Sequence, residues 1–334
     1  MTNRQILVTE LPTGELTPEN FALSETAMPV PAAGEVLLRV ILMSIDAANR
    51  SWMQGATYRA AVNAGDAMPT YAICEVVESN SPKLAAGDIV AAEATWSDYI
   101  TTQGHKVTKL PPVPKLSNLM SVFGIAGKTA YHGLMSIGQP QPGETVLVSA
   151  AAGSVGGYVG QIAKSLGCRV VGIAGGKEKC DWVMEQFGFD ACIDYRADGL
   201  FKALRAACPQ GVDVYFDNVG GTILETALNL MNERGRIVCC GAISQYQSTA
   251  PTGPRNLPGA LVVKRLRMEG FIVMDFAHND ATAIRAMQGM MERGQLKVTE
   301  DIVEGLENAP NALIGLLNGD NKGKRMVRVS ADPT

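Results

Sequence analysis

The sequence predicts an α/β fold in two domains, a β-rich and partly open barrel followed by a doubly wound parallel sheet. Up to about Ser121, short apolar runs alternate with turn residues, a pattern typical of short strands. Beyond that residue, apolar strands alternate with amphipathic helices, which favours parallel βαβ units. The length of 334 residues suits two domains, and 46% hydrophobic against 19% charged residues can supply two buried cores.

The first domain contains three clear strands, separated by turn segments rich in Pro, Ala or Gly. They are expected at 35–44, 73–78 and 88–92. A further strand should follow the segment 96–99, and we expect Trp96 to close the mouth of the barrel.

The second domain contains six short apolar runs joined by helical segments. The runs are expected to be strands at 146–150, 169–174, 191–194, 212–217, 236–240 and 268–273. Because helices connect them, the strands should lie parallel in one doubly wound sheet.

After these units the sequence predicts two more helices and a last strand. The first helix covers 281–293. The second follows Asn308, a residue type that caps helices, has Pro310 in its first turn and ends at Gly319. The closing segment 323–330 alternates charged and apolar residues, as a strand does, and suggests that the chain returns to the first domain.

A turn of small residues between the first strand and helix of the second domain predicts a dinucleotide site. The usual pattern is G-x-G-x-x-G, and here it is Ala151-x-Gly153-x-x-Gly156, with alanine in the first place. Gly153 would let the backbone approach a pyrophosphate, and Gly156 would let the helix pack on the sheet. Packing alone is the alternative explanation of such a turn.

The end of the next strand favours NADP(H) over NAD(H). An NAD site usually places Asp or Glu about 20 residues beyond the glycine turn, where it binds the ribose hydroxyls. This chain has Gly175 and Gly176 there, followed by Lys177 and Lys179, which can neutralise a 2′-phosphate. Two alternatives stay open: the lysines are only solvated helix-start residues, or Glu178 meets a ribose hydroxyl.

Charge and composition exclude several classes of partner. A net charge of −4 gives no reason to expect nucleic acid or an anionic membrane as a partner. The first residues lack the apolar core of a signal peptide, and Arg39 interrupts the best apolar run. The seven cysteines show no C-x-x-C spacing. We therefore expect a soluble protein of the reducing cytoplasm.

Several motifs, in order along the chain, resemble one known family. They are 126–131 (Ala-Gly-Lys-Thr-Ala-Tyr), 142–148, the glycine turn, 216–221 (Phe-Asp-Asn-Val-Gly-Gly), 235–246, 266–271 and 319–324. The chain resembles the zinc-free prostaglandin reductase and alkenal double-bond reductase branch of the medium-chain dehydrogenase/reductase superfamily. That branch includes leukotriene B4 12-hydroxydehydrogenase and the bacterial curcumin reductases.

The resemblance implies a fold, a reaction and an assembly. The fold is a GroES-like domain over 1–122 and 296–334, with a Rossmann NADP-binding domain over 123–295. The reaction is NADPH-dependent reduction of the C=C bond of α,β-unsaturated aldehydes and ketones, by hydride transfer to the β-carbon. The assembly is a homodimer through the edge of the Rossmann sheet.

The resemblance also implies which residues bind the cofactor. Positions 154–157 would follow the pyrophosphate, Lys179 and Tyr195 would hold the 2′-phosphate, and Asn321 would close over the cofactor from the other domain. Asn218 would lie near the cofactor, 240–246 would pass the nicotinamide, and 271–273 would form its wall. The full set is Ser154, Val155, Gly156, Gly157, Lys179, Tyr195, Asn218, Cys240, Gly241, Ala242, Ile243, Ser244, Tyr246, Phe271, Ile272, Val273 and Asn321.

Tyr246 is the candidate catalytic residue. Hydride addition to an enone moves negative charge to the carbonyl oxygen, and a neutral phenol can donate a hydrogen bond to that oxygen. A ribose hydroxyl of the cofactor could be the second donor. The alternative is that Tyr246 only packs at the domain junction. No acid suggests itself for the α-carbon, and the neighbouring Cys239 and Cys240 lack a basic partner that would activate a thiol.

Zinc is disfavoured by the available residues. The alcohol-dehydrogenase branch binds catalytic zinc through Cys and His ligands, and catalytic zinc usually takes three of them. This chain has three histidines, and Lys106 stands where that branch's histidine motif has glutamate after His105. Cys74 has no neighbouring ligand. Without a Lewis acid, the reaction must rely on hydrogen-bond donors.

The N-terminal pocket departs from the family pattern. Family members often carry Asp-Pro-Tyr-Met-Arg where this chain has Asp-Ala-Ala-Asn-Arg at 46–50, so a tyrosine suspected of contacting substrate becomes Ala48. Tyr58 or Tyr71 could substitute for it. Lys128 either contacts cofactor phosphate or is solvated. Two further functions stay open: a quinone reductase, and a non-catalytic NADPH-binding protein.

Overall fold

The computed structural model describes residues 2–248, 250 and 252–333. Its contacts divide the chain into two units. Unit 1 comprises the residues up to Met120, Glu300–Asp320 and the residues from Arg325 onward, and unit 2 comprises Ser121–Thr299 and Asn321–Lys324. Each unit is described by itself below.

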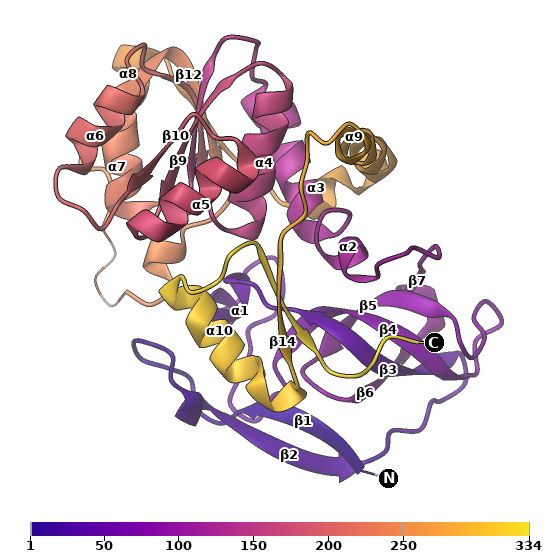
Figure 1. Ribbon diagram of the computed structural model, residues 1–334. Helices are drawn as coiled ribbons and strands as arrows, with labels where there is room; N and C mark the ends of the chain where they lie inside the picture. Colours follow the sequence, from indigo (N-terminus) through magenta and orange to yellow (C-terminus); the bar gives the residue numbers. More distant parts are fainter. Residues whose placement is uncertain (1, 249, 251, 334) are drawn as a thin grey trace. The chain divides into compact units, whose positions relative to one another are not determined.

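Unit 1 is built on a sheet in which β3 (Glu35–Ser44) is the long central strand (Figure 1). The strand order is β14-β15-β3-β4-β5-β7, and β6 also pairs with β3. The remaining strands are β4 (Pro69–Ser79), β5 (Ile89–Thr95), β6 (Tyr99–Gln103), β7 (Thr108–Lys109), β14 (Glu300–Glu304) and β15 (Lys324–Arg328). A separate antiparallel pair is formed by β1 (Thr2–Val8) and β2 (Phe21–Ala27). The helices are α1 (Ala48–Trp52), α2 (Ser117–Met120) and α10 (Ala309–Asn318).

Both faces of β3 carry buried apolar side chains. Val36, Leu38 and Val40 belong to one apolar cluster, whereas Ile41 and Leu42 belong to another, and all are buried. A strand with both faces covered reads as a continuous apolar run, which is why the sequence predicts 35–44 without error. The strand predicted after Trp96–Tyr99 is β6, and Trp96 is fully buried and stacked on Phe21, with ring centroids 5.5 Å apart.

Unit 2 contains a six-stranded parallel sheet in the order β10-β9-β8-β11-β12-β13. Numbered from β8, this order is 3-2-1-4-5-6, the order of the doubly wound dinucleotide-binding sheet. The strands are β8 (Thr145–Ser149), β9 (Arg169–Ala174), β10 (Ala191–Asp194), β11 (Val212–Asp217), β12 (Met231–Cys239) and β13 (Arg267–Gly270). The α/β prediction with a β-rich first domain and a doubly wound second domain is confirmed.

Helices cover both faces of this sheet (Figure 1). The helices are α3 (Ile125–His132), α4 (Ser154–Ser165), α5 (Lys177–Phe187), α6 (Leu200–Ala207), α7 (Gly221–Leu230), α8 (Leu257–Lys264) and α9 (Asp280–Glu292). Val146 and Val148 pack in one apolar cluster and Leu147 in the other, as the period of two along a strand requires.

Two elements near the end of the chain differ from their predictions. The strand expected at 268–273 ends at Gly270, because its partner β12 ends at Cys239, which pairs with Gly270. Asn308 does stand before α10, but its side chain does not accept a hydrogen bond from the helix. Its Nδ2 instead donates to the carbonyl oxygen of Glu304 over 2.7 Å. The return of the chain to the first domain is confirmed, because β15 pairs antiparallel with β3.

The segment Asn321–Lys324 lies in unit 2, although the residues on both sides of it lie in unit 1. The amide of Gly323 donates to the carbonyl oxygen of Ala152 over 2.8 Å, and Gly323 forms an isolated parallel bridge with Gly153. Gly323 has φ +78°, and a Cβ there would overlap the backbone of Thr299. All of 296–334 is expected in the first domain, whereas the contacts assign 296–299 and 321–324 to unit 2.

Candidate functional site

The turn between β8 and α4 is shaped by small residues. A Cβ on Gly156 would overlap the carbonyl oxygen of Ala150, so the close approach of helix and turn requires glycine there. The amide of Gly153 donates to the same oxygen over 2.9 Å. The left-handed backbone of this turn falls on Ala150, with φ +51°, and not on Ala151, the alanine that replaces the first glycine of the motif.

The start of α4 presents helix amides next to this turn. Gly153 is the N-cap, and it has no side chain that could accept from the first-turn N–H groups of Ser154 and Val155. Such an end attracts an anion through its N–H groups and the helix dipole. Gly157 lies one turn inside, where a Cβ would stand 2.7 Å from the ring of Phe187. The turn and the helix start therefore fit a pyrophosphate.

The end of β9 carries the residues predicted to select the cofactor. Lys179 donates from Nζ to the backbone oxygen of Asn321 over 2.6 Å, so these two predicted residues lie together. Glu178 pairs with Lys322 at 2.8 Å, and this pairing lowers the pKa of the exposed Glu178 carboxyl. Tyr195 lies at the end of β10 and is 43% exposed.

A buried carboxylate holds the loop that contains Asn218. Asp217 Oδ1 accepts from the phenol of Tyr215 over 2.7 Å and from the amides of Val219 and Gly220 over 3.0 and 2.9 Å. Asn218 is tied to the end of β8, since its Nδ2 donates to the oxygen of Ser149 over 2.8 Å. Asp217 belongs to the motif 216–221, but this role is not predicted from the sequence.

The segment 240–246 folds over that loop. The amides of Cys240 and Gly241 donate to the oxygen of Asp217 over 2.9 and 3.2 Å, and Ile243 donates to that of Asn218 over 3.3 Å. Ser244 Oγ donates to the oxygen of Val219 over 2.6 Å. Burial raises the pKa of the Cys240 thiol to about 12, so the thiol stays protonated at neutral pH.

The hydroxyl of Tyr246 lies at the centre of this segment. It accepts a hydrogen bond from the amide of Ala242 over 3.3 Å, and a Cβ on Gly241 would stand 3.5 Å from it. Burial raises the pKa of the phenol, outweighing the opposite effect of the Ala242 amide. The group is therefore a neutral hydrogen-bond donor at physiological pH.

The segment 271–273 lies in the same unit, and the ring of its first residue, Phe271, packs against other side chains of that unit. Phe271 lies against Gly133, at the end of α3, and its ring centroid is 6.1 Å from that of Phe276. Ile272 precedes a 3₁₀ turn that begins at Val273. The predicted role of these residues as a wall of the nicotinamide stays a prediction.

Several further candidates have partners within their own unit. Lys128 forms an ion pair with Asp280 at 2.7 Å, so its amino group is directed at α9. Ala48 begins α1, and on this helix Trp52 makes an edge contact with Tyr58 at 6.4 Å and carries the guanidinium of Arg59 at 4.4 Å.

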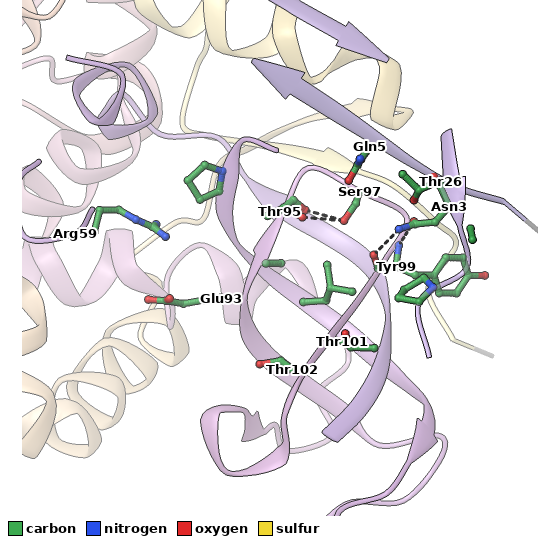
Figure 2. Close-up of a pocket in the computed structure, with 15 residues that line it drawn as sticks. Asn3, Gln5, Thr26, Arg59, Glu93, Thr95, Ser97, Tyr99, Thr101 and Thr102 are labelled. Atoms are coloured by element: carbon green, nitrogen blue, oxygen red, sulfur yellow. Dashed lines mark hydrogen bonds between the residues drawn. The ribbon is translucent and has the colours of Figure 1, made fainter. Parts of the chain in front are cut away.

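Unit 1 also contains an open hollow of about 510 Å³ (Figure 2). Figure 2 shows Arg59 and Glu93 on one side and the hydroxyl side chains of Thr101 and Thr102 nearby. The residues that line it include none of those predicted to bind cofactor.

The described part of the chain offers neither a cluster of metal ligands nor a membrane-spanning helix. It contains no group of three or more His, Cys, Asp or Glu side chains that could hold a metal ion. Within the same residues, no helix combines the length and the apolar character that crossing a bilayer requires. His105 lies in the 3₁₀ turn Gly104–Lys106, and burial raises the pKa of Cys74 to about 12.

Comparisons with known proteins cover nearly the whole chain. A family model described as the N-terminal domain of oxidoreductase matches residues 4–110, and one described as zinc-binding dehydrogenase matches 154–289. The chain is 42% identical to the NADPH-dependent curcumin reductase of Escherichia coli K12, over 99% of this chain and 98% of that one. It is 38% identical to the NADP(+)-dependent 2-alkenal reductase of Nicotiana tabacum, over 99% of both chains.

A solved structure agrees with these relatives. The structure of CurA from Vibrio vulnificus in complex with NADPH matches this fold with a TM-score of 0.94 and 41% identity. The match covers 98% of this chain and 100% of that one.

Proposed function

The chain belongs to the zinc-independent medium-chain dehydrogenase/reductase family, in its curcumin reductase-like branch, and on that premise we propose that it reduces activated C=C bonds. It is an NADP-dependent oxidoreductase of small molecules. Its proposed substrates are α,β-unsaturated aldehydes and ketones. When bound, NADPH supplies a hydride to the β-carbon, and the charge that leaves the C=C bond collects on the carbonyl oxygen as an enolate.

The residues around the glycine turn support this cofactor. Ser154 to Gly157 would follow the pyrophosphate, because the turn excludes a Cβ at Gly156 and the helix start has no side-chain cap. Lys179 and Tyr195 would hold the 2′-phosphate at the end of β9. The loops after β11 and β12, which contain Asn218 and the segment 240–246, would approach the nicotinamide, since ligands of such sheets bind at the carboxyl ends of the strands.

One observation supports the catalytic step most directly, the hydrogen bond from the Ala242 amide to the Tyr246 hydroxyl. Because the phenol oxygen accepts that bond, its own proton can point at a substrate oxygen. The raised pKa keeps this proton in place at neutral pH. A fixed donor aimed at developing negative charge is the usual way in which enzymes stabilise an enolate. The proton that completes the α-carbon would come from solvent.

The test is oxidation of NADPH, with NADH alongside, against trans-2-nonenal, a 15-keto enone and a quinone, with products identified by mass spectrometry. A saturated carbonyl product and a strong preference for NADPH are expected. Quinol as the only product would instead assign the chain to quinone reduction. Tight NADPH binding without oxidation by any acceptor would indicate a non-catalytic binding protein.

We further propose that the protein is a homodimer of the cytoplasm, joined at the edge of the unit 2 sheet. β13 is the last strand in that sheet, so one of its edges has no neighbouring strand in the described order. Val262 and Val263 on the preceding α8 are 75% and 70% exposed. An open strand edge beside exposed apolar side chains is suited to pairing with a second copy.

A further inference from the structure

A guanidinium from the loop after β10 lies beside the end of β9, where NAD sites carry a carboxylate. In doubly wound sheets, the residue at the tip of the second strand decides whether a ribose hydroxyl or a phosphate is bound. Here that residue is Gly175, so its own side chain contributes nothing. Its surroundings do contribute, because the space beside its Cα is filled by the loop that follows β10.

Arg196 reaches into that space. A Cβ placed on Gly175 would stand 3.0 Å from Arg196 Nε, 3.2 Å from its Cζ and 3.0 Å from Tyr195 Cε1. The guanidinium carbon is 5.8 Å from the centroid of the Tyr195 ring. The backbone beneath is fixed, since Asp194 Oδ1 accepts from the amide of Arg196 over 2.9 Å and from that of Gly176 over 2.7 Å. The same carboxylate therefore holds the backbone after β9 and the backbone of Arg196 together.

The charges around the strand tip favour an anion. Asp194 directs one oxygen at two backbone amides, and Glu178 pairs with Lys322 at 2.8 Å. Asp181 pairs with Lys177 at 2.5 Å. Lys179 donates to the backbone oxygen of Asn321 over 2.6 Å. A phosphate at the tip would lie beside two cationic side chains, Lys179 and Arg196.

We infer that Arg196 is a second determinant of NADP(H) selectivity, which binds the 2′-phosphate together with Lys179. The inference rests on the proposed placement of the adenosine end of the cofactor at β9. A guanidinium presents N–H groups in a planar fork that matches phosphate oxygens, whereas Lys179 supplies a point charge. A ribose that lacks the phosphate would gain nothing from Arg196, so the residue discriminates between the two cofactors.

The experiment measures binding of adenosine 2′,5′-bisphosphate and of 5′-AMP to the full chain by calorimetry, without substrate. Arg196→Gln should weaken the binding of the bisphosphate about tenfold or more, as loss of a charged hydrogen bond implies. The affinity for 5′-AMP should not change. Arg196→Lys should restore part of the affinity. The salt dependence of bisphosphate binding should become shallower in Arg196→Gln. Arg205→Gln on α6 is the matched control, and it should bind both nucleotides as the unmodified chain does.

If Arg196→Gln weakened the binding of both nucleotides equally, the inference would be overturned, because Arg196 would then only support the local fold. Unchanged bisphosphate affinity would overturn it as well. A chain that binds NADPH but not the bisphosphate would contradict the placement of the adenosine end, and with it the premise. None of these results depends on enone reduction, so failure of the proposed reaction is observed separately, in the product assay.

Discussion

At the scale of single residues, the environment of the Tyr246 hydroxyl predicts that this group acts as a hydrogen-bond donor in the reaction. Tyr246→Phe removes the donor and keeps the ring, so we expect kcat for an enal to fall by about 10². The dissociation constant of NADPH should change little. Because burial raises the pKa of the phenol, kcat of the unmodified enzyme should show no loss assignable to this tyrosine between about pH 7 and about pH 9. Steady-state rates with separate NADPH titration check this, and an unaltered kcat in the variant would refute the assigned role.

Ala150 gives a second prediction at this scale, on stability. Its φ of +51° is left-handed, which costs alanine about 1–2 kcal/mol and glycine much less. Ala150→Gly should therefore raise the free energy of unfolding by about 0.5–1 kcal/mol, after the larger chain entropy of glycine is subtracted. Urea titration measures this change. Ala152→Gly, at a position without positive φ, should lower the same quantity, and a lower value for both variants would contradict the argument.

At the scale of elements, α3 and α9 are joined by a buried polar group. His132 on α3 is 2% exposed, lies 3.4 Å from Asp280 Oδ1 and stacks on Phe276, with centroids 5.1 Å apart. Lys128 pairs with the other oxygen of Asp280. Burial lowers the pKa of His132, and repulsion from Lys128 and His278 acts in the same direction, while Asp280 opposes it.

This pKa shift predicts a loss of stability in mild acid. Below the ordinary pKa of 6.5, the unfolded chain binds a proton at this ring more readily than the folded chain does. The free energy of unfolding should therefore fall as the pH drops through 6.5 and below, and it should recover as the pH rises. Urea titrations at a series of pH values measure this slope. His132→Gln should flatten it and His105→Gln, an exposed histidine of unit 1, should not; equal slopes in all three proteins would count against the account.

Among the elements that the sequence predicts to the residue, β3, β9 and β11 are largely buried, and their apolar runs end at turn residues. The edge strand β10 is predicted equally well, although its side chains are only half-buried. β2 is missed because most of its side chains are exposed and no apolar run marks it.

Site residues are predictable from the sequence where they stand in a local motif. The glycine turn and Lys179 stand in recognisable motifs. Arg196 lies beside Gly175 only in the folded sheet, so no linear motif joins the two. The carboxylate of Asp217 holds its own loop, a role that its place in a motif does not reveal.

At the scale of the whole molecule, the open edge of β13 predicts the state of association. Val263→Asp places a charge on the exposed apolar surface of α8, and burying an unpaired charge in an interface is costly. We expect light scattering after size-exclusion chromatography to report a dimer for the unmodified chain and a shift toward monomer for the variant. A matched change on another helix, Phe201→Asp on α6, should leave the dimer intact. A monomer in both cases would exclude the proposed assembly.

The four residues Asn321–Lys324 have a consequence for recombination. They pack on the turn after β8, yet they are encoded far downstream, between stretches that belong to the other unit. Consider a chimaera that joins residues 121–299 of this chain to the first unit of another protein. Its residues at 321–324 would then come from that other protein. The piece of this gene that can be exchanged intact is therefore discontinuous, and any single crossover between the glycine turn and residue 321 separates the turn from its own partner.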